Sequence, residues 1–253
     1  MIFLGLKGFG DFTILVCFLN KCKEMHTVII RKELEELAIK LLNKRHRLVI
    51  LSSVKKIYPI YSLRKFSYKD ISIALKGAFE IRKIIKELKQ QLVLDLKSIR
   101  NNVLFCGLDK LYLENKTSLY NSYAHLLDIE NYAVSFAGNE KKILVFPTGS
   151  IASKIIKSNY IVDLCKRNNI NIKNIIIVIY EVQSIYADNY KNFNVKIYKN
   201  IDELLQLIDQ SDGIISVDTF QLHLAIQKQK PLIMAGKVNK NFLPEYQKNS
   251  NNK

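Results

Sequence analysis

Three short stretches of the chain combine glycine, small polar and charged residues in patterns that could bind and activate a phosphorylated substrate. The first, Gly8-Phe9-Gly10-Asp11, directly follows an apolar stretch from Ile2 to Leu6. Glycines at these two positions would allow a tight turn and the close approach of a ligand, and the Asp11 carboxylate could accept a proton from a substrate hydroxyl. Asp11 could instead be only the N-cap of the following helix. The third glycine of a dinucleotide-binding fingerprint is missing, so the loop does not indicate nicotinamide binding.

The second stretch is Phe146-Pro147-Thr148-Gly149-Ser150, followed by Lys154. This pattern predicts a strand, a loop of small residues, and a lysine in the first turn of a helix. A basic residue is unfavourable in that turn because the helix N-terminus carries the positive end of the macrodipole. A bound anion would explain Lys154, and the alternative is an ordinary exposed lysine in a lysine-rich chain.

The third stretch predicts a short buried strand from Gly213 to Ser216 that turns into a helix starting at Thr219. A helix N-terminus presents unpaired backbone N–H groups and a positive dipole end, so it can bind phosphate. Asp218 stands at the junction of strand and helix. It could also act only as an N-cap, with Gln221 completing a capping box.

Strands alternate with helices along the whole chain, which predicts an α/β fold with mainly parallel sheets. In the front half we expect strands at residues 2–6, 47–51, 92–96 and 103–106, and helices at 12–21, 33–43, 70–90 and 118–128. In the rear half we expect strands at 143–146, 174–179, 195–198, 213–216 and 232–234, and helices at 154–166, 201–209 and 219–227.

These elements predict two doubly wound, Rossmann-like domains of similar size that face a central cleft. We place the first domain at residues 1–138, the second at 139–246, and a polar, disordered tail at 247–253. The boundary is set where a polar segment follows the last apolar pattern of the front half. Ligands of open α/β sheets bind outside the carboxyl ends of the strands, and the three stretches all fall there.

The composition restricts the partners and the compartment. The chain has 39 Lys and Arg residues against 23 Asp and Glu, a net charge of +16, which favours an anionic partner such as nucleic acid, a membrane surface or a phosphorylated substrate. No nucleic-acid-binding motif appears. The four cysteines and four histidines are scattered, so we expect neither a disulfide framework nor a metal site. We find no run long enough to cross a bilayer and no clear signal peptide, and we expect a cytoplasmic protein.

The three stretches, in this order and spacing, resemble glycosyltransferase family 9, the ADP-heptose:lipopolysaccharide heptosyltransferases, which have the two-domain GT-B architecture. Residues 8–11 are similar to the N-terminal glycine–aspartate loop of that family, and residues 146–154 to its donor segment. Leu92-Val93-Leu94-Asp95-Leu96-Lys97-Ser98 is similar to a family strand, and residues 211–219, with His223-Leu224-Ala225 and Lys230-Pro231, resemble its most specific signature. The resemblance covers most of the chain and is thin between residues 30 and 90.

The resemblance implies an inverting, metal-independent transfer of a heptose-like sugar from a nucleotide diphosphate donor such as ADP-heptose. The acceptor would be the lipopolysaccharide core or a related phosphorylated glycolipid, reached by peripheral contact with the anionic inner face of the cytoplasmic membrane. The resemblance implies no cofactor and no specific nucleic acid. Asp11, beside the loop glycines Gly8 and Gly10, would be the general base on the acceptor hydroxyl.

The donor site implied by the resemblance consists of Thr148, Ser150, Lys154, Asp218, Thr219, Phe220, Gln221 and His223. In it Lys154 and Thr148 would hold the diphosphate, Asp218 would contact the sugar hydroxyls, and backbone amides of residues 219–221 would cradle the phosphates. His223 would be a phosphate neighbour or a packing residue, and we favour packing.

Three features depart from the family pattern. Phe220 stands where the family usually has glycine, Lys237-Val238-Asn239 replaces the usual loop after the last strand, and the C-terminal end is shorter than in family members. Two alternatives therefore stay open: a non-catalytic, GT-B-like binding protein in which Phe220 blocks the donor site, and a basic α/β protein that binds nucleic acid.

Overall fold

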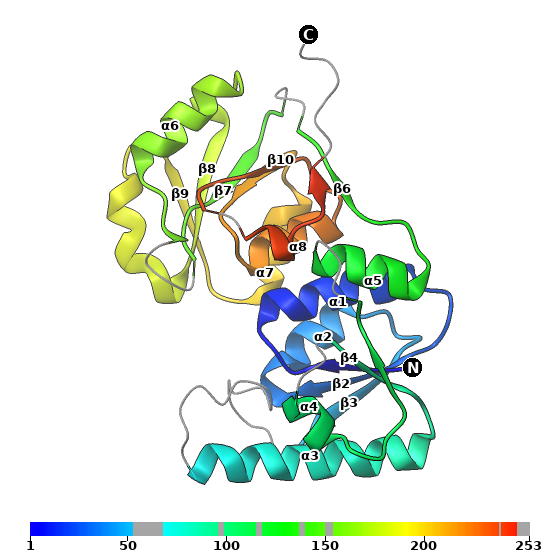
Figure 1. Cartoon of the computed structure of the whole chain (residues 1–253). Coiled ribbons are helices and arrows are strands. Elements are labelled where there is room, and N and C mark those ends of the chain that lie inside the picture. Colours follow the sequence, from blue (N-terminus) through cyan, green and yellow to red (C-terminus); the bar gives the residue numbers. More distant parts are fainter. Residues whose placement is uncertain are drawn as a thin grey trace. The chain divides into compact units, whose positions relative to one another are not determined.

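The computed structural model describes residues 1–52, 68–95, 99–114, 118–136, 140–149, 154–237 and 239–246. The chain divides into two compact units, Met1–Asn131 and Tyr132–Lys253, and Figure 1 shows a central sheet flanked by helices in each. The predicted domain boundary after residue 138 and the predicted tail at 247–253 lie outside the described residues.

The first unit is built on a five-stranded, fully parallel sheet in the order β3-β2-β1-β4-β5. Its elements are β1 Ile2–Gly5, α1 Phe9–Lys21, β2 Thr27–Arg31, the 3₁₀ helix η1 Lys32–Leu34, α2 Glu35–Leu41, β3 Arg47–Leu51, α3 Tyr68–Leu88, β4 Leu92–Leu94, α4 Ile99–Leu104, β5 Lys110–Tyr112 and α5 Leu119–Leu127. Figure 1 shows α1 and α5 on one face of this sheet and α3 and α4 on the other.

The second unit contains another five-stranded, fully parallel sheet, in the order β11-β10-β7-β8-β9. Its elements are β6 Ala133–Val134, β7 Ile143–Phe146, α6 Ser158–Arg167, η3 Ile172–Asn174, β8 Ile175–Tyr180, η4 Glu181–Tyr190, β9 Asn194–Tyr198, α7 Ile201–Asp209, β10 Gly213–Ser216, α8 Phe220–Gln227, β11 Leu232–Met234, η5 Lys240–Phe242 and β12 Glu245–Tyr246. The short strand β12 pairs with β6 beside the main sheet.

Both sheets use the same strand order when their strands are counted along the chain. In each unit the first three strands build outward from the centre, and the fourth returns to the other side of the first. The order therefore reverses between β1 and β4 in the first unit and between β7 and β10 in the second. A reversal of this kind leaves a crevice at the carboxyl ends of the two central strands, where doubly wound proteins bind ligands.

The predicted α/β fold with parallel sheets is confirmed, and two element predictions are wrong. The strand predicted at 103–106 is helix followed by turn, because α4 ends at Leu104 and β5 starts only at Lys110. A short apolar run does not distinguish a strand from a buried helical turn. The helix predicted at 154–166 begins at Ser158, so Lys154 precedes it. The strands β2, β5, β6 and β12 and the long 3₁₀ helix η4 were not predicted.

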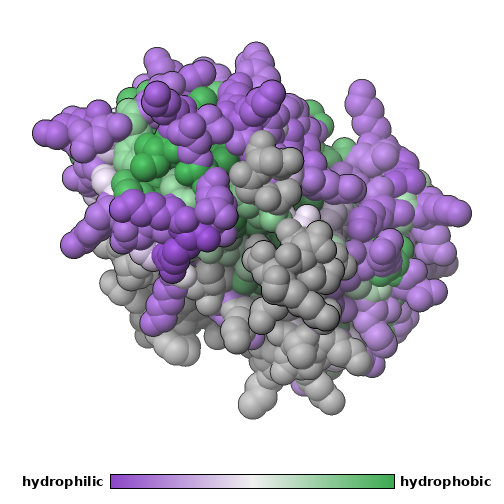
Figure 2. Space-filling model, turned by 90° about the horizontal axis from the view of Figure 1, so that it is seen from above, coloured by the Kyte–Doolittle hydropathy of each residue, from purple (hydrophilic) through white to green (hydrophobic). Residues whose placement is uncertain are grey.

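The surface agrees with the basic, polar composition. Hydrophilic side chains make up most of the coloured surface in Figure 2, with smaller hydrophobic areas between them. Among the residues that the structure describes, no helix is both long and apolar enough to span a bilayer.

A stacked pair of histidines lies in the core of the first unit. The rings of His26 and His46 lie 5.8 Å apart at an interplanar angle of 7°, and Phe3 packs edge-on against His26. The backbone N–H of His26 donates to His46 Nδ1 at 3.2 Å, and His46 Nε2 lies 2.9 Å from the Leu19 carbonyl oxygen. Burial, together with the positive N-terminus and His46, lowers the pKa of His26 to about 4.

Protonation of His26 should make the fold sensitive to acid. The pKa of His26 is about 4 in the folded protein, against an ordinary value of 6.5, so the unfolded chain binds the proton first as the pH falls between these values. We expect the free energy of unfolding to fall by about 2 kcal/mol between pH 7 and pH 5 from this group. Urea titrations at both pH values measure this change, and the free energy of unfolding should fall less in His26→Phe than in the wild type. The exposed His125 supplies the control, since His125→Gln should keep the full loss, and an unchanged pH dependence in His26→Phe would contradict the assignment.

Candidate functional site

The strand-order reversal in the first unit carries a small polar pocket. It lies between the end of β1, the start of α1, the end of β4 and α5, and its polar lining residues are Lys7, Asp11, Asp95 and Tyr123. The cavity volume is about 20 Å³, which is room for about one water molecule. A substrate hydroxyl could enter such a pocket, whereas a whole sugar ring would have to remain at its mouth.

Asp11 stands in the first turn of α1 and is not its N-cap. Gly8 is the N-cap, in an ordinary extended conformation with φ −70°, and Gly10 lies inside the helix. Neither glycine adopts a positive φ, so the backbone conformation does not require glycine at either position. The chain enters the helix through a conformation that any residue can adopt. A Cβ at position 8 would lie 3.5 Å from Asp11 Oδ2.

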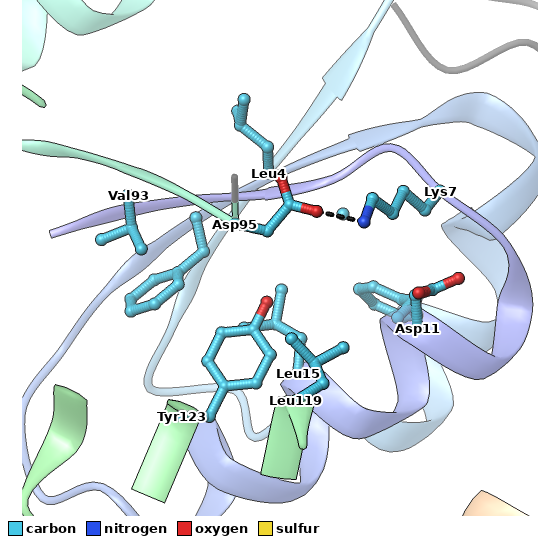
Figure 3. A pocket seen from close by; sticks show the side chains of 11 residues that line it. Leu4, Lys7, Asp11, Leu15, Val93, Asp95, Leu119 and Tyr123 are labelled. Atoms are coloured by element: carbon cyan, nitrogen blue, oxygen red, sulfur yellow. Dashed lines mark ion pairs between the residues drawn. The ribbon is translucent and has the colours of Figure 1, made fainter. Parts of the chain in front are cut away.

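The pKa of Asp11 is raised above its ordinary value. Burial is the largest cause, and the neighbouring Asp95 carboxylate adds to it. Lys7 opposes the increase, as do hydrogen bonds from the backbone amides of Asp11 and Gly8. Lys7 forms its ion pair with Asp95, and Figure 3 shows these two side chains pointing toward each other while Asp11 projects from α1. A half-buried carboxylate whose neighbouring lysine is paired with another carboxylate is a stronger proton acceptor than a fully exposed one.

Tyr123 closes the inner side of the pocket. Its ring is buried against Phe18 at 5.9 Å and Phe3 at 6.4 Å, and Figure 3 shows its hydroxyl pointing into the pocket. Burial and the charges of Asp95 and Asp11 raise the pKa of Tyr123 far above its ordinary value. The hydroxyl therefore stays protonated and can donate a hydrogen bond to a bound oxygen.

Asp95 and Tyr123 were not among the predicted site residues. Asp95 directly follows the buried strand β4, and that signal became informative only once β4 was found beside β1 in the sheet. Tyr123 lies on the buried side of an ordinary amphipathic helix, and no sequence pattern marks it.

The strand-order reversal in the second unit carries a lysine–aspartate pair. Lys154 Nζ donates to Asp218 Oδ2 at 3.0 Å and to the Asp218 carbonyl oxygen at 2.7 Å. Lys154 follows β7 and Asp218 follows β10, so the pair joins the carboxyl ends of the two central strands. The structure thus brings Lys154 and Asp218 together within the unit, although Lys154 stands in a 3₁₀ turn before α6 and not in the first turn of that helix.

The interpretation of Asp218 as an N-cap with Gln221 in a capping box is wrong. Thr219 is the N-cap of α8, without a side-chain capping hydrogen bond. The carboxylate of Asp218 turns to Lys154, and Gln221 Nε2 donates to the Tyr198 hydroxyl at 2.7 Å. A full positive charge on lysine competes with the backbone amides for this carboxylate, and the amide end of α8 is left without a side-chain cap.

Gly149 sets the path of the Lys154 side chain. A Cβ at this position would lie 2.5 Å from Lys154 Cβ and 3.1 Å from its Cδ, so any larger residue would displace the base of the lysine. The loop is held from the other side by η4, because Thr148 Oγ1 donates to Gln183 Oε1 and Gln183 Nε2 donates to the Gly149 carbonyl, both at 2.8 Å. Thr148 is buried, and its hydroxyl group uses its proton in the hydrogen bond to Gln183 that holds the loop. Ser150 lies outside the described residues.

His223 lies in the buried part of the same cluster. It is 4% exposed, and burial lowers its pKa to about 4, with Asp218 opposing and Lys154 adding to the effect. A neutral, buried imidazole supplies no positive charge to a phosphate. Phe220 is the first residue of α8 and is partly exposed.

An aromatic pair next to α8 was also missed. The rings of Tyr180, at the end of β8, and Tyr198, at the end of β9, lie 5.2 Å apart. Tyr198 is the acceptor of the Gln221 hydrogen bond, and its burial raises its pKa to about 12. Alternating strand residues normally pack in the core, so the sequence gives no reason to place these two tyrosines at a site. Among the described residues, no group of three His, Cys, Asp or Glu side chains could hold a metal ion.

Comparison with known proteins identifies the fold. No protein-family model matches the chain, and no curated protein matches it in sequence. The glycosyltransferase family 9 protein of Veillonella parvula DSM 2008 superposes with a TM-score of 0.59 at 13% identity, over 92% of this chain and 79% of that one.

Two E. coli structures give similar results. ADP-heptose lps heptosyltransferase II has a TM-score of 0.54 at 10% identity, over 92% of this chain and 83% of that one. Heptosyltransferase WaaC with ADP-2-deoxy-2-fluoro heptose has a TM-score of 0.52 at 12% identity, over 95% of this chain and 90% of that one. The chain has a heptosyltransferase-like fold, as the resemblance implied.

The electrostatics of the first pocket predict opposite effects for two substitutions. Asp95→Asn removes a negative neighbour and releases Lys7, so the pKa of Asp11 should fall. Lys7→Gln removes the cation, so the pKa of Asp11 should rise further. Carboxyl-carbon NMR titration of Asp11 in the wild type and the two variants would measure both shifts. Shifts of the same sign in the two variants would show that the Lys7–Asp95 pair does not control this carboxyl group.

Proposed function

We propose that the chain is an inverting, metal-independent glycosyltransferase that moves a heptose-like sugar from a nucleoside diphosphate to the lipopolysaccharide core or a related phosphorylated glycolipid. The proposal is supported chiefly by the polar residues at the two strand-order reversals. Those in the first unit could accept a proton, and those in the second could bind a phosphate. A half-buried carboxylate occupies the first reversal, and a lysine with an uncapped helix N-terminus occupies the second.

The second unit would bind the donor. The backbone amides at the start of α8 and the Lys154 ammonium would stabilise the charge that develops on the departing diphosphate. Lys154 would then exchange part of its contact with Asp218 for a phosphate oxygen, which leaves the Asp218 carboxylate available to the sugar hydroxyls. The tight contact between Gly149 and the base of the lysine restricts where Nζ can move during this exchange.

The first unit would activate the acceptor. Asp11 would accept the proton of the acceptor hydroxyl as its oxygen attacks the anomeric carbon of the donor, while the bond to the diphosphate breaks on the opposite face. A general base of this kind contributes about 10²–10⁴-fold to the rate. The raised pKa of Asp11 suits that step, and Tyr123 would donate a hydrogen bond within the same pocket.

The chemistry of the partners follows from the same proposal. One structural neighbour, E. coli WaaC, was solved with ADP and with ADP-2-deoxy-2-fluoro heptose, which supports an adenine nucleotide as the donor. The net charge of +16 supports a phosphorylated acceptor and peripheral contact with the inner face of the cytoplasmic membrane.

Phe220 favours one other function. A ring at the first position of α8 could narrow the approach to the helix N-terminus, and the protein would then be a GT-B-like binding module without transfer activity. Catalysis and nucleotide binding have to be measured separately to distinguish the two functions.

Asp11→Asn tests the catalytic half of the proposal. We expect a loss of transfer activity of at least about 10²-fold with unchanged ADP affinity, measured by product formation and by calorimetry. The unfolding free energy should stay the same or increase, because a carboxyl group with a raised pKa destabilises the folded state when it is charged. Unchanged turnover in Asp11→Asn would remove Asp11 as the base.

Lys154→Met and Gly149→Ala test the donor half. Loss of a charge-assisted hydrogen bond should weaken ADP binding by about 10- to 100-fold in Lys154→Met, and Gly149→Ala should weaken it by displacing the same side chain. Lys166→Met removes an exposed lysine of α6 and should have no effect. ADP should raise the thermal unfolding temperature more than UDP or GDP, and a response to none of the three would contradict a nucleotide donor.

A further inference from the structure

The longest helix of the first unit has a hydrophobic and basic outer face. The inner face of α3 packs on the sheet through Ala78, Ile81 and Ile85, which are 4% exposed or less. Figure 1 shows α3 along the outer side of this sheet, with α4 beside it. Surface helices normally carry polar residues opposite the core face, so the residues on the outer side of α3 require an explanation.

Two large apolar side chains lie on that outer side. Phe79 is 69% exposed and Leu75 is 46% exposed, and their spacing of four residues places them next to each other on the helix. Val103, on α4, is also 69% exposed, and α4 is joined to α3 by a hydrogen bond from Arg82 to the Leu104 carbonyl at 3.2 Å. Three exposed apolar groups therefore belong to this one surface layer.

Lysines accompany these apolar groups. Lys76, Lys83 and Lys86 are exposed. Together with Phe79 they follow one another at intervals of three or four residues, which puts them on the same side of α3. Within the described part of the chain, no ion pair involves any of the three. Glu87 is the exposed acidic residue at the C-terminal end of this face, whereas Glu80 accepts hydrogen bonds from the Ser52 backbone N–H and hydroxyl.

From this combination we infer that the outer face of α3, consisting of Leu75, Lys76, Phe79, Lys83 and Lys86, docks on an anionic lipid bilayer. Helices that lie in the membrane interface combine an apolar group, which enters the boundary of headgroups and acyl chains, with lysines that contact anionic lipid. Two or three apolar side chains are too few for the core of a stable protein–protein interface. They are enough to anchor the helix at the membrane interface when attraction between the lysines and anionic lipid supplies the remaining binding free energy.

This inference locates the membrane contact of the proposed function. It depends on the surface of the first unit alone, so a protein without transferase activity could still bind vesicles, and an active transferase could fail to bind them. Vesicle binding and sugar transfer are separate measurements, and the two proposals can fail independently.

A tryptophan at position 79 tests the location directly. The natural chain contains no tryptophan, so Phe79→Trp gives a single reporter with little change in apolar character. With vesicles of phosphatidylcholine and phosphatidylglycerol we expect its emission to shift to shorter wavelength and to be quenched by brominated acyl chains. Ile185→Trp, at a 78% exposed position of η4, is the matched control and should not respond. A response at position 185 equal to that at position 79, or none at position 79, would overturn the proposal.

The charged part of the face is tested by vesicle flotation of the full chain. Each lysine near an anionic surface contributes about fivefold to binding, so Lys76→Gln/Lys83→Gln should reduce affinity about 25-fold. Lys166→Gln/Lys191→Gln removes two exposed lysines of the second unit and should have a much smaller effect. Equal losses in the two double variants, or equal binding to phosphatidylcholine alone, would overturn the proposal. So would an emission shift of Phe79→Trp produced by single-stranded DNA and not by vesicles.

Discussion

The reversal of strand order at the centre of each parallel sheet is the constraint on which both candidate sites depend. In a parallel sheet every strand ends at the same edge and helices cover both faces, so the strand-to-helix loops, beside which ligands bind, all lie at that edge. Where the fourth strand returns beside the first, the two connections leave in opposite directions and do not fill the space between them. Asp11 and Asp95 follow one such pair of strands, and Lys154 and Asp218 follow the other.

The two sites solve the problem of a desolvated charge in different ways. In the first unit, Lys7 neutralises Asp95, and burial raises the pKa of Asp11, which costs stability when that carboxyl group is ionised. In the second unit, the charges of Lys154 and Asp218 neutralise each other over 3.0 Å, and the burial of His223 holds that side chain uncharged. The first arrangement leaves Asp11 with a raised pKa, and the second holds the Lys154 ammonium against Asp218.

The elements that carry these groups could be predicted from the sequence, because they depend on local patterns. Buried strands followed by small or acidic residues identified β1, β7 and β10, and with them Asp11, Lys154 and Asp218. The contacts of those side chains could not be predicted. The sequence gives the same N-cap pattern for Asp218 whether or not a lysine from a loop 64 residues away competes for its carboxylate. The requirement for glycine at position 149 could not be predicted for a similar reason. It arises because the Lys154 side chain passes close to this residue, and not from the φ angle of Gly149.

Asp95 shows which kind of information was missing. Its strand was identified, but neighbouring strands in a parallel sheet need not be neighbours in the sequence, and β4 lies beside β1 only because β2 and β3 were added on the other side. Once that order is known, a carboxylate after β4 must lie near one after β1. The same reasoning explains how a chain with 13% identity to a solved glycosyltransferase can retain its fold, because strand order and buried apolar pattern restrict the backbone while leaving most side chains free to change. The positions at the two reversals carry the polar side chains of both candidate sites, and Phe220, at the start of α8, lies beside the second of them.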